Sequence, residues 1–333
     1  MIRVAVDALG GDSAPDEVVA GAAEAASEEI LPILFGPAGL DAQGLELVET
    51  TQEIAMDEKP AEAVRAKPDS SLVAACRAVG RGEADAVVSA GNTGAMLAAC
   101  FLELRRLPGV ARPAIAVVIP AEQGPSVLLD SGANADGRPE HLLQFAHMGS
   151  VFSEEVLGVP NPQVRLLSIG EEPEKGNQLT LEAHALLESA EGLNFGGNTE
   201  SRDLLRGAAD VVVCDGFTGN VALKLMEGTI KAVLDTLREE ITASRRGRVG
   251  GLLVRPAARA LRKRLDPETY GGAYLLGLRG LAVIAHGNSS RRAIANAIRL
   301  AARGVEHDVV ARLAQRLPER VLASARSQTT TGK

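Results

Sequence analysis

Residues 86–94 read AVVSAGNTG, a short apolar run that passes directly into a small, polar, glycine-rich turn, and a helical pattern follows over residues 94–106. An apolar run without polar alternation is typical of a strand that is covered on both faces. A strand, a tight turn and a helix in succession are typical of the units that build a parallel sheet. This stretch therefore predicts an α/β fold.

The same succession recurs along the chain. We interpret as buried strands the apolar runs at residues 2–6, 31–35, 86–88, 114–119, 127–129, 164–169, 211–213 and 281–284, with helical patterns at 16–28, 72–81, 94–106 and 139–152. The alternation predicts a largely parallel sheet. Although 333 residues could form two domains, no linker or repeat divides them. We predict one α/β domain over residues 1–326 and a flexible tail at 327–333.

One region departs from this alternation. From residue 221 to about residue 265 the pattern is helical only, with a break around Gly247, Gly250 and Gly251. We predict a helical excursion from the sheet at about residues 221–275, an element suited to dimerisation or docking.

Composition argues against several classes of function. The chain has 2% aromatic residues and no Trp, so it lacks the stacking surfaces that bind single-stranded nucleic acid, and its net charge of -8 gives no general attraction to a polyanion. Cys76, Cys100 and Cys214 lie in apolar contexts without a Cys-x-x-Cys pair, which predicts buried free thiols. The sequence shows no signal peptide and no apolar run of ~20 residues. We expect a soluble, cytoplasmic protein with no nucleic-acid partner.

Five glycine-rich turns follow predicted strands, at residues 7–12, 89–94, 130–134, 214–220 and 285–290. Each turn offers free backbone N–H groups, and ligands of open parallel sheets bind beyond the carboxyl ends of the strands. We therefore expect these turns to lie at one edge of the sheet and to form a cleft suited to phosphate. The alternative for any single turn is geometric, because Gly, Asn, Asp and Ser also serve as turn and helix-cap residues.

The candidate site residues come mainly from these turns. The expected phosphate- or substrate-binding residues are Gly10, Gly11, Asn92, Thr93, Gly94, Asn134, Asn177, Thr218, Gly219, Asn220 and Lys224, and the catalytic candidates are Lys175, His286 and Asp215. An ammonium group at Lys175, in the polar turn 170–177, could meet a phosphate or a developing oxyanion. Its alternative is a surface ion pair with a neighbouring Glu. His286 alone among the histidines ends a strand and opens a glycine turn.

Motifs of the common nucleotide- and metal-dependent enzymes are missing. The sequence contains no G-x-G-x-x-G after a strand, no G-x-x-x-x-G-K-[ST], no G-x-S-x-G and no H-E-x-x-H. Asp7 with Asp12, or Asp130 with Asp136, could hold a hard cation, but helix capping accounts for these carboxylates at least as well. We predict no metal site.

The turns and their order resemble one family, the bacterial phosphate acyltransferases of phospholipid synthesis. The resemblance covers nearly the whole chain, and it rests on residues 7–12, 89–94, 130–141, 170–177, 214–224 and 285–287. Two departures are small: Leu9 stands where the family usually has Met, and Asn288 where Ser is usual.

The resemblance implies transfer of a long-chain acyl group from acyl carrier protein to inorganic phosphate. It also implies a three-layer α/β/α fold similar to phosphate acetyltransferases and isocitrate-type dehydrogenases, a homodimer, and peripheral association with the inner face of the cell membrane. Phosphate is already an anionic nucleophile, so positioning and oxyanion stabilisation suffice without a metal or an organic cofactor. The alternatives are a phosphate acetyltransferase-like enzyme that uses a short acyl-coenzyme A, and a non-catalytic regulator that binds acyl carrier protein or membrane.

A basic segment lies inside the predicted excursion. Residues 242–265 contain no acidic residue and eight basic ones, namely Arg245, Arg246, Arg248, Arg255, Arg259, Arg262, Lys263 and Arg264. Pro256 suits the first turn of a helix here. We expect the segment to contact acyl carrier protein, which is acidic, or an anionic membrane touched by residues 252–254. The alternative is a dimer-interface helix with a solvated basic face.

Overall fold

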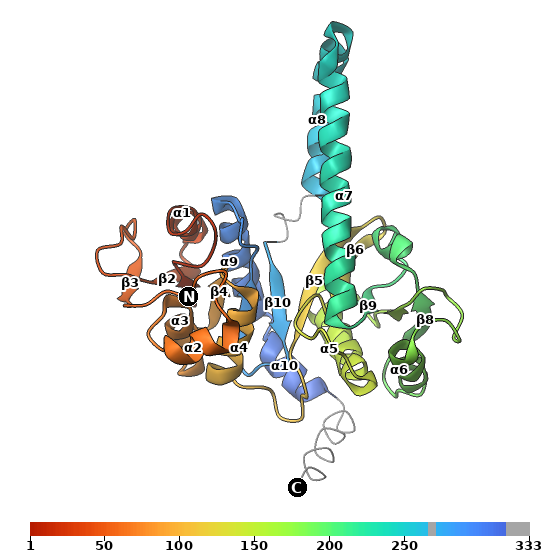
Figure 1. Ribbon diagram of the computed structural model, residues 1–333, viewed down its shortest axis with the longest axis horizontal. Coiled ribbons are helices and arrows are strands. Elements are labelled where there is room, and N and C mark those ends of the chain that lie inside the picture. The colour runs from red at the N-terminus through yellow and green to blue at the C-terminus, as the bar shows by residue number, and fades with distance from the viewer. Residues whose placement is uncertain (266–270, 318–333) are drawn as a thin grey trace.

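The computed structural model describes residues 1–265 and 271–317, and within them eleven strands form a single mixed sheet (Figure 1). The strands are β1 (Ile2–Asp7), β2 (Ile30–Gly36), β3 (Glu46–Glu49), β4 (Ala86–Ser89), β5 (Ala114–Ala121), β6 (Gly124–Leu129), β7 (Val164–Leu167), β8 (Phe195–Thr199), β9 (Val211–Val213), β10 (Ala273–Leu276) and β11 (Leu281–Ile284). The helices are α1 (Asp16–Ala25), α2 (Pro60–Ala66), α3 (Ser71–Gly80), α4 (Thr93–Glu103), α5 (Pro139–Leu157), α6 (Gln178–Glu188), α7 (Gly216–Ala243), α8 (Arg245–Leu265), α9 (Arg291–Glu306) and α10 (Val309–Arg316), with a 3-10 helix η1 at Ser201–Arg206. Helices cover both faces, which confirms the predicted three-layer α/β/α architecture.

The sheet consists of two parallel groups that run in opposite directions. Its order is β3-β2-β1-β4-β11-β10-β5-β6-β9-β7-β8. Strands β3, β2, β1, β4 and β11 are mutually parallel, and so are β6, β9, β7 and β8. Between these groups β10 pairs antiparallel with β11 and β5, and β5 pairs antiparallel with β6. The carboxyl ends of the two groups therefore point to opposite edges, so the expectation that all five turns lie at one edge was wrong.

The two faces of the sheet are covered differently. Alternate residues of each central strand face opposite layers, so that in β1 Val4 and Val6 pack under one layer and Ala5 packs under the other. One layer, formed by α1, α5, α6, α9 and α10, has a single continuous core. The other has two separate clusters, one beneath α2, α3 and α4 and one beneath α7 and η1. Val117 of β5 lies at the border and contacts both clusters.

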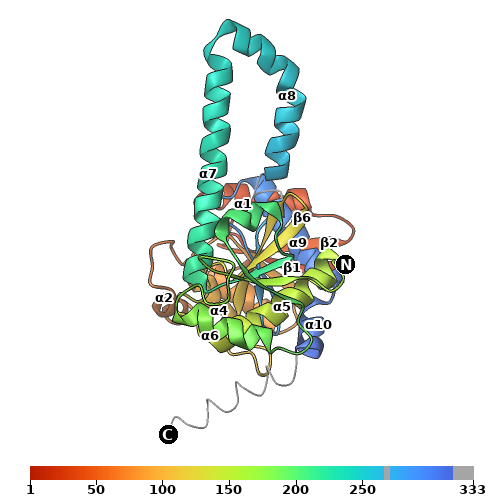
Figure 2. The same ribbon diagram turned by 90° about the vertical axis from the view of Figure 1, so that its right-hand side faces the viewer.

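Helices α7 and α8 extend away from the α/β body (Figures 1 and 2). Leu223 is the last buried residue of α7, Met226 and Ile230 are partly buried over the cavity, and beyond them the helix leaves the α/β body. We call residues 231–265 the arm. The predicted helical excursion is thus present. Its break lies at Ser244, and the three glycines that were expected to break it lie within α8. Pro256 also lies inside α8 rather than in the first turn of a helix.

The predicted strands and helices are present with small shifts of their ends, and three further strands were not predicted. They are β3, β8 and β10. The three cysteines are buried free thiols, as predicted. The predicted tail at residues 327–333 lies outside the described residues. Among the described helices, none is both long and apolar enough to cross a bilayer.

Candidate active site

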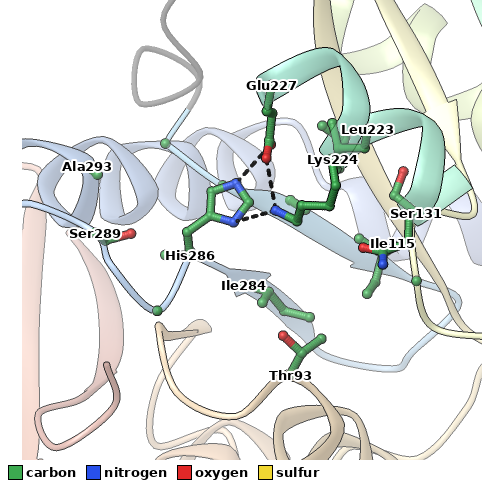
Figure 3. Close-up of a pocket in the computed structure, with 18 of the residues that line it drawn as sticks. Thr93, Ile115, Ser131, Leu223, Lys224, Glu227, Ile284, His286, Ser289 and Ala293 are labelled. Carbon is green, nitrogen blue, oxygen red and sulfur yellow. Dashed lines mark hydrogen bonds and ion pairs between the residues drawn. The ribbon is translucent and has the colours of Figure 1, made fainter. Parts of the chain in front are cut away.

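A cavity of about 430 Å³ lies where the split layer leaves the sheet uncovered. Its floor comes from β5, β10 and β11, with Ile115, Val117 and Ile284 facing into it. Helix α7 forms one wall, and the turn after β11 with the start of α9 forms the other (Figure 3). The antiparallel centre of the sheet therefore places the cavity over a face of the sheet instead of at its edge.

Three charged or titratable side chains meet across the cavity. Lys224 Nζ lies 2.9 Å from Glu227 Oε2, His286 Nε2 lies 3.3 Å from Glu227 Oε1, and Lys224 Nζ lies 3.4 Å from His286 Nδ1 (Figure 3). Lys224 and Glu227 are one helical turn apart on α7, whereas His286 follows β11. The cluster therefore joins the two walls. About half of the Lys224 and His286 side chains is exposed, so a ligand can reach them.

Glu227 is the least exposed member of the cluster, at 20% of its side chain. Burial acts to raise the pKa of Glu227, but its contacts with His286 and Lys224 outweigh burial and lower that pKa below the ordinary value. The carboxylate is therefore ionised at neutral pH. It holds Lys224 and His286 in place.

A buried carboxylate organises the turn beside the cavity. Asp130 accepts hydrogen bonds from the backbone N–H groups of Ile115, Gly132, Ala133 and Asn134, and from the Asn134 side chain. Burial raises the pKa of Asp130. Because the N–H of Ser131 donates to the carbonyl of Ile115, the N–H groups of residues 131–134 are all bonded internally. The expectation that this turn offers free N–H groups was wrong, but Ser131 and Gly132 still line the cavity.

A second buried carboxylate, Asp7, organises the turn after β4 by hydrogen bonds. Asp7 accepts 2.6 Å hydrogen bonds from the hydroxyls of Ser71 and Ser89, and Ser89 in turn accepts from the N–H of Gly91. Burial raises the pKa of Asp7. A Cβ at Gly10 would lie 2.4 Å from Asp7 Oδ2, so only glycine fits here. Among the described residues no group of three metal-ligating side chains occurs, and these aspartates are bonded to protein donors.

Four of the predicted site residues line the cavity, namely Thr93, Asn220, Lys224 and His286. Five others have structural contacts. Asn92, Asn177 and Asp215 are the N-caps of α4, α6 and α7, and the side chain of Thr218 donates to Asp215. Asn134 donates to the carbonyl of Pro113 and to Asp130. The geometric alternative raised by the sequence thus accounts for these contacts.

The remaining predicted residues lie outside the cavity lining. At Gly94 and Gly219 a Cβ would collide with Pro60 and with the Asp130 carbonyl, while Gly10 and Gly11 pack against the turn after β4. Lys175 follows β7 and does not line the cavity, unlike Ser131 and Asn220, which follow β6 and β9 of the same parallel group. The structure therefore does not bring Lys175 together with His286 in this cavity, and the expected convergence is not found for Lys175.

Sequence reasoning missed Glu227. Its position three residues after Lys224 places both side chains on one face of a helix, which was the available signal. The pairing with His286, 59 residues further along, depends on how α7 lies against β11 and has no counterpart in the local sequence.

The basic segment lies on α8. Arg245, Arg246, Arg248, Arg255 and Arg259 are exposed there. The side chains of the other three predicted contacts are outside the described residues, namely Arg262, Lys263 and Arg264. Residues 252–254, expected to touch a membrane, are exposed as well.

Known proteins match this chain over nearly its full length. The model of a family described as "Fatty acid synthesis protein" matches residues 2–312. A phosphate acyltransferase from Heliobacterium modesticaldum is 48% identical and the alignment covers 96% of this chain and 99% of the relative. Another from Nostoc sp. is 44% identical, with 94% of this chain and 95% of the relative covered.

Solved structures match in fold. The EutD phosphotransacetylase from Staphylococcus aureus aligns with a TM-score of 0.59 at 18% identity, over 91% of this chain and 94% of its own. A putative 4-hydroxythreonine-4-phosphate dehydrogenase from Salmonella typhimurium aligns with a TM-score of 0.52 at 11% identity, over 91% and 98%. The predicted likeness of fold to phosphate acetyltransferases is therefore confirmed.

Proposed function

We propose that this acyltransferase, which belongs to the fatty acid synthesis protein family, moves a long-chain acyl group from the thioester of acyl carrier protein to inorganic phosphate. The names of the relatives support phosphate as the acceptor. The product would be an acyl phosphate for phospholipid synthesis. The non-catalytic alternative is set aside because this chain is an enzyme.

The observation that carries the proposal is the Lys224–Glu227–His286 cluster, which lines a largely aliphatic cavity. A dianionic acceptor needs a cation to hold it against an uncharged thioester carbonyl. Lys224 supplies that charge at a half-exposed position, and the ionised Glu227 fixes its direction. Asn220 and Ser131, which line the same cavity, add an amide and a hydroxyl for the phosphate oxygens.

The reaction then needs few groups. A phosphate oxygen attacks the thioester carbonyl carbon, a C–O bond forms, and negative charge develops on the carbonyl oxygen. The C–S bond then breaks, and the thiolate of the carrier leaves and takes up a proton. In this scheme Lys224 binds phosphate and stabilises the developing oxyanion, while His286, held by Glu227, is placed to give the thiolate its proton. The catalytic roles of Lys175 and Asp215 remain predictions from the sequence.

An assay of the purified full-length chain tests the reaction. Palmitoyl-acyl carrier protein and inorganic phosphate are supplied, and acyl phosphate is trapped with hydroxylamine as the hydroxamate. We expect phosphate-dependent product from this donor and little from acetyl-coenzyme A. A preference for acetyl-coenzyme A would favour the phosphate acetyltransferase-like alternative, and no product from either donor would reject acyl transfer to phosphate.

We also propose a homodimer and peripheral binding at the inner face of the cell membrane. Phe217, Val221 and Leu225 recur every four residues on α7 and are at least half exposed, so a second copy of the chain would bury this apolar stripe. On α8, exposed arginines flank Leu252 and Leu253, which suits an anionic lipid surface or the acidic carrier protein.

Charge reversal on α8 tests the membrane contact. Each basic residue near an anionic surface contributes about 1 kcal/mol, so Arg255→Glu/Arg259→Glu/Arg262→Glu should abolish co-sedimentation with anionic vesicles at low salt. High salt should weaken binding of the parent protein. Sedimentation velocity of both proteins reports the dimer separately.

The matched control carries the same change of charge on the α/β body, as Arg65→Glu/Arg81→Glu/Arg202→Glu, at three exposed positions. We expect this control to sediment with vesicles like the parent. If both variants lose binding equally, net charge and not the arm is responsible.

A further inference from the structure

The polarity of the cavity changes across α7. Asn220, Lys224 and Glu227 recur every three to four residues on one face of the helix, and Leu223, Met226 and Ile230 recur likewise on the adjacent face. From Asn220 to Ile230 the helix rises by about 15 Å. The cavity is thus long, with a polar stripe beside an aliphatic stripe.

The aliphatic side of the cavity is an incompletely covered part of the hydrophobic core. Val117 of β5 contacts both clusters of the split layer, yet it is only partly buried, as is Met226 opposite it. Ile119 and Leu223 are buried behind them. The neighbouring β5 residues Ala116 and Val118 are buried in the core of the continuous layer. Among the described residues, nothing fills the equivalent space over Val117, and apolar surface left open in this way favours an apolar ligand.

We infer that this aliphatic slot holds the acyl chain, with the thioester carbonyl near Lys224 and the chain running along α7 past Ile230, and that Ile230 sets the preferred chain length. The inference rests on the proposed function. A ligand with one polar head and an unbranched apolar tail matches lining of this kind, whereas a peptide or a nucleotide would bury polar groups against Val117 and Met226 without partners.

The position of Ile230 allows the inference to be tested by substitution. It is half-buried at the last turn of α7 that lines the cavity, so a larger side chain there shortens the slot without entering a packed core. In an apolar pocket each methylene that no longer fits lowers kcat/KM by about 10-fold or more. Long chains should lose several such contacts, while a chain that ends short of Ile230 should lose none.

The experiment compares donors of two lengths. The ratio of kcat/KM for palmitoyl- over butyryl-acyl carrier protein is measured for the parent and for Ile230→Trp, with Ile230→Phe as a milder second variant. We expect the ratio to fall at least 10-fold in Ile230→Trp and by less in Ile230→Phe. The matched control is Thr229→Trp, an exposed neighbour that does not line the cavity, which should keep the parent ratio.

Equilibrium dialysis with radiolabelled palmitate provides a readout that does not depend on turnover. The parent and Thr229→Trp should bind palmitate, and Ile230→Trp should bind it at least 10-fold more weakly. An unchanged ratio and unchanged palmitate binding in Ile230→Trp, or equal changes in Thr229→Trp, would overturn the slot. A parent that binds palmitate but transfers no acyl group would instead overturn the proposed function and leave the slot supported.

Discussion

The layer of helices α1, α5, α6, α9 and α10 forms one core with the sheet, whereas the opposite layer forms two cores with a cavity between them. In the continuous layer the helices approach closely. A Cβ at Gly21 of α1 would lie 2.5 Å from the backbone of Arg291, and one at Gly149 of α5 would lie 2.6 Å from Val211. In the split layer α7 has no fully buried residue after Leu223, and Met226 and Ile230 line the cavity instead.

The titratable groups of the two layers differ in the same way. His147 of α5 is buried, and burial alone lowers its pKa to about 4, so it remains neutral. Lys224, Glu227 and His286 of the split layer face a cavity and one another. The comparison indicates that the continuous layer supplies stability and the split layer supplies chemistry, and four substitutions can break or sharpen that division.

The largest effect is expected in the continuous layer. Phe145 of α5 is fully buried, so Phe145→Ala should lower the free energy of unfolding by about 3–5 kcal/mol through lost burial and a residual cavity. Urea unfolding measures the change. Leu102→Ala, on an exposed face of α4 in the split layer, is the control and should cost well under 1 kcal/mol. Similar losses at both positions would contradict the division.

The second effect should appear in catalysis and not in stability. Lys224→Ala should lower kcat/KM for acyl transfer by about 10²–10³, the range for one lost oxyanion donor, and leave the free energy of unfolding within about 0.5 kcal/mol, since the side chain is half exposed. Lys231→Ala, two turns further along α7 and exposed, is the control. A loss at Lys175→Ala with none at Lys224→Ala would move the phosphate site from the cavity to the turn after β7.

How far the sequence predicts this division depends on the element. Strands that are covered on both faces are unbroken apolar runs, so eight of the strands were recognisable. The missed strand β3 is a four-residue, mostly exposed edge strand, and β8 contains two glycines and an asparagine. Strand direction is not encoded in a local run, and the antiparallel centre around β10 reverses half of the sheet. That reversal is why the turns do not lie at one edge.

The site was predictable in part for a similar reason. His286 and Lys224 stood out because each is a rare residue type beside a glycine-rich turn. Asn92 and Asp215 stood out for their turn chemistry, and in the structure they cap helices. Capping and ligand binding use the same short polar side chains at the same helix ends. Only the packing of α7 over the sheet separates residues that face the cavity from those that do not.

The third prediction concerns pH and the continuous layer. His147 has a pKa of about 4 in the folded protein against an ordinary value of 6.5, so the unfolded chain binds the proton more readily. Stability is therefore lost as the pH falls from 6.5 towards 4. Between pH 7 and pH 5 the parent should lose about 2 kcal/mol through this residue.

His147→Leu removes this titration. Its urea unfolding should therefore depend on pH less steeply than that of the parent over the same interval. Parallel profiles for the two proteins would show that His147 already titrates normally and that the continuous layer is open to water there.

The smallest effect tests the boundary between capping and catalysis at Asp215. Its carboxylate accepts from the N–H of Thr218 at 2.9 Å and from the Thr218 hydroxyl at 2.7 Å, and it does not line the cavity. Asp215→Ala should lower the free energy of unfolding by about 1 kcal/mol, the usual cost of a lost N-cap. Asparagine caps as well as aspartate, so Asp215→Asn should keep both stability and acyl transfer. A loss of activity in Asp215→Asn with unchanged unfolding would mean that the negative charge itself acts in the reaction, and the first turn of α7 would then belong to the chemistry as well as to the fold.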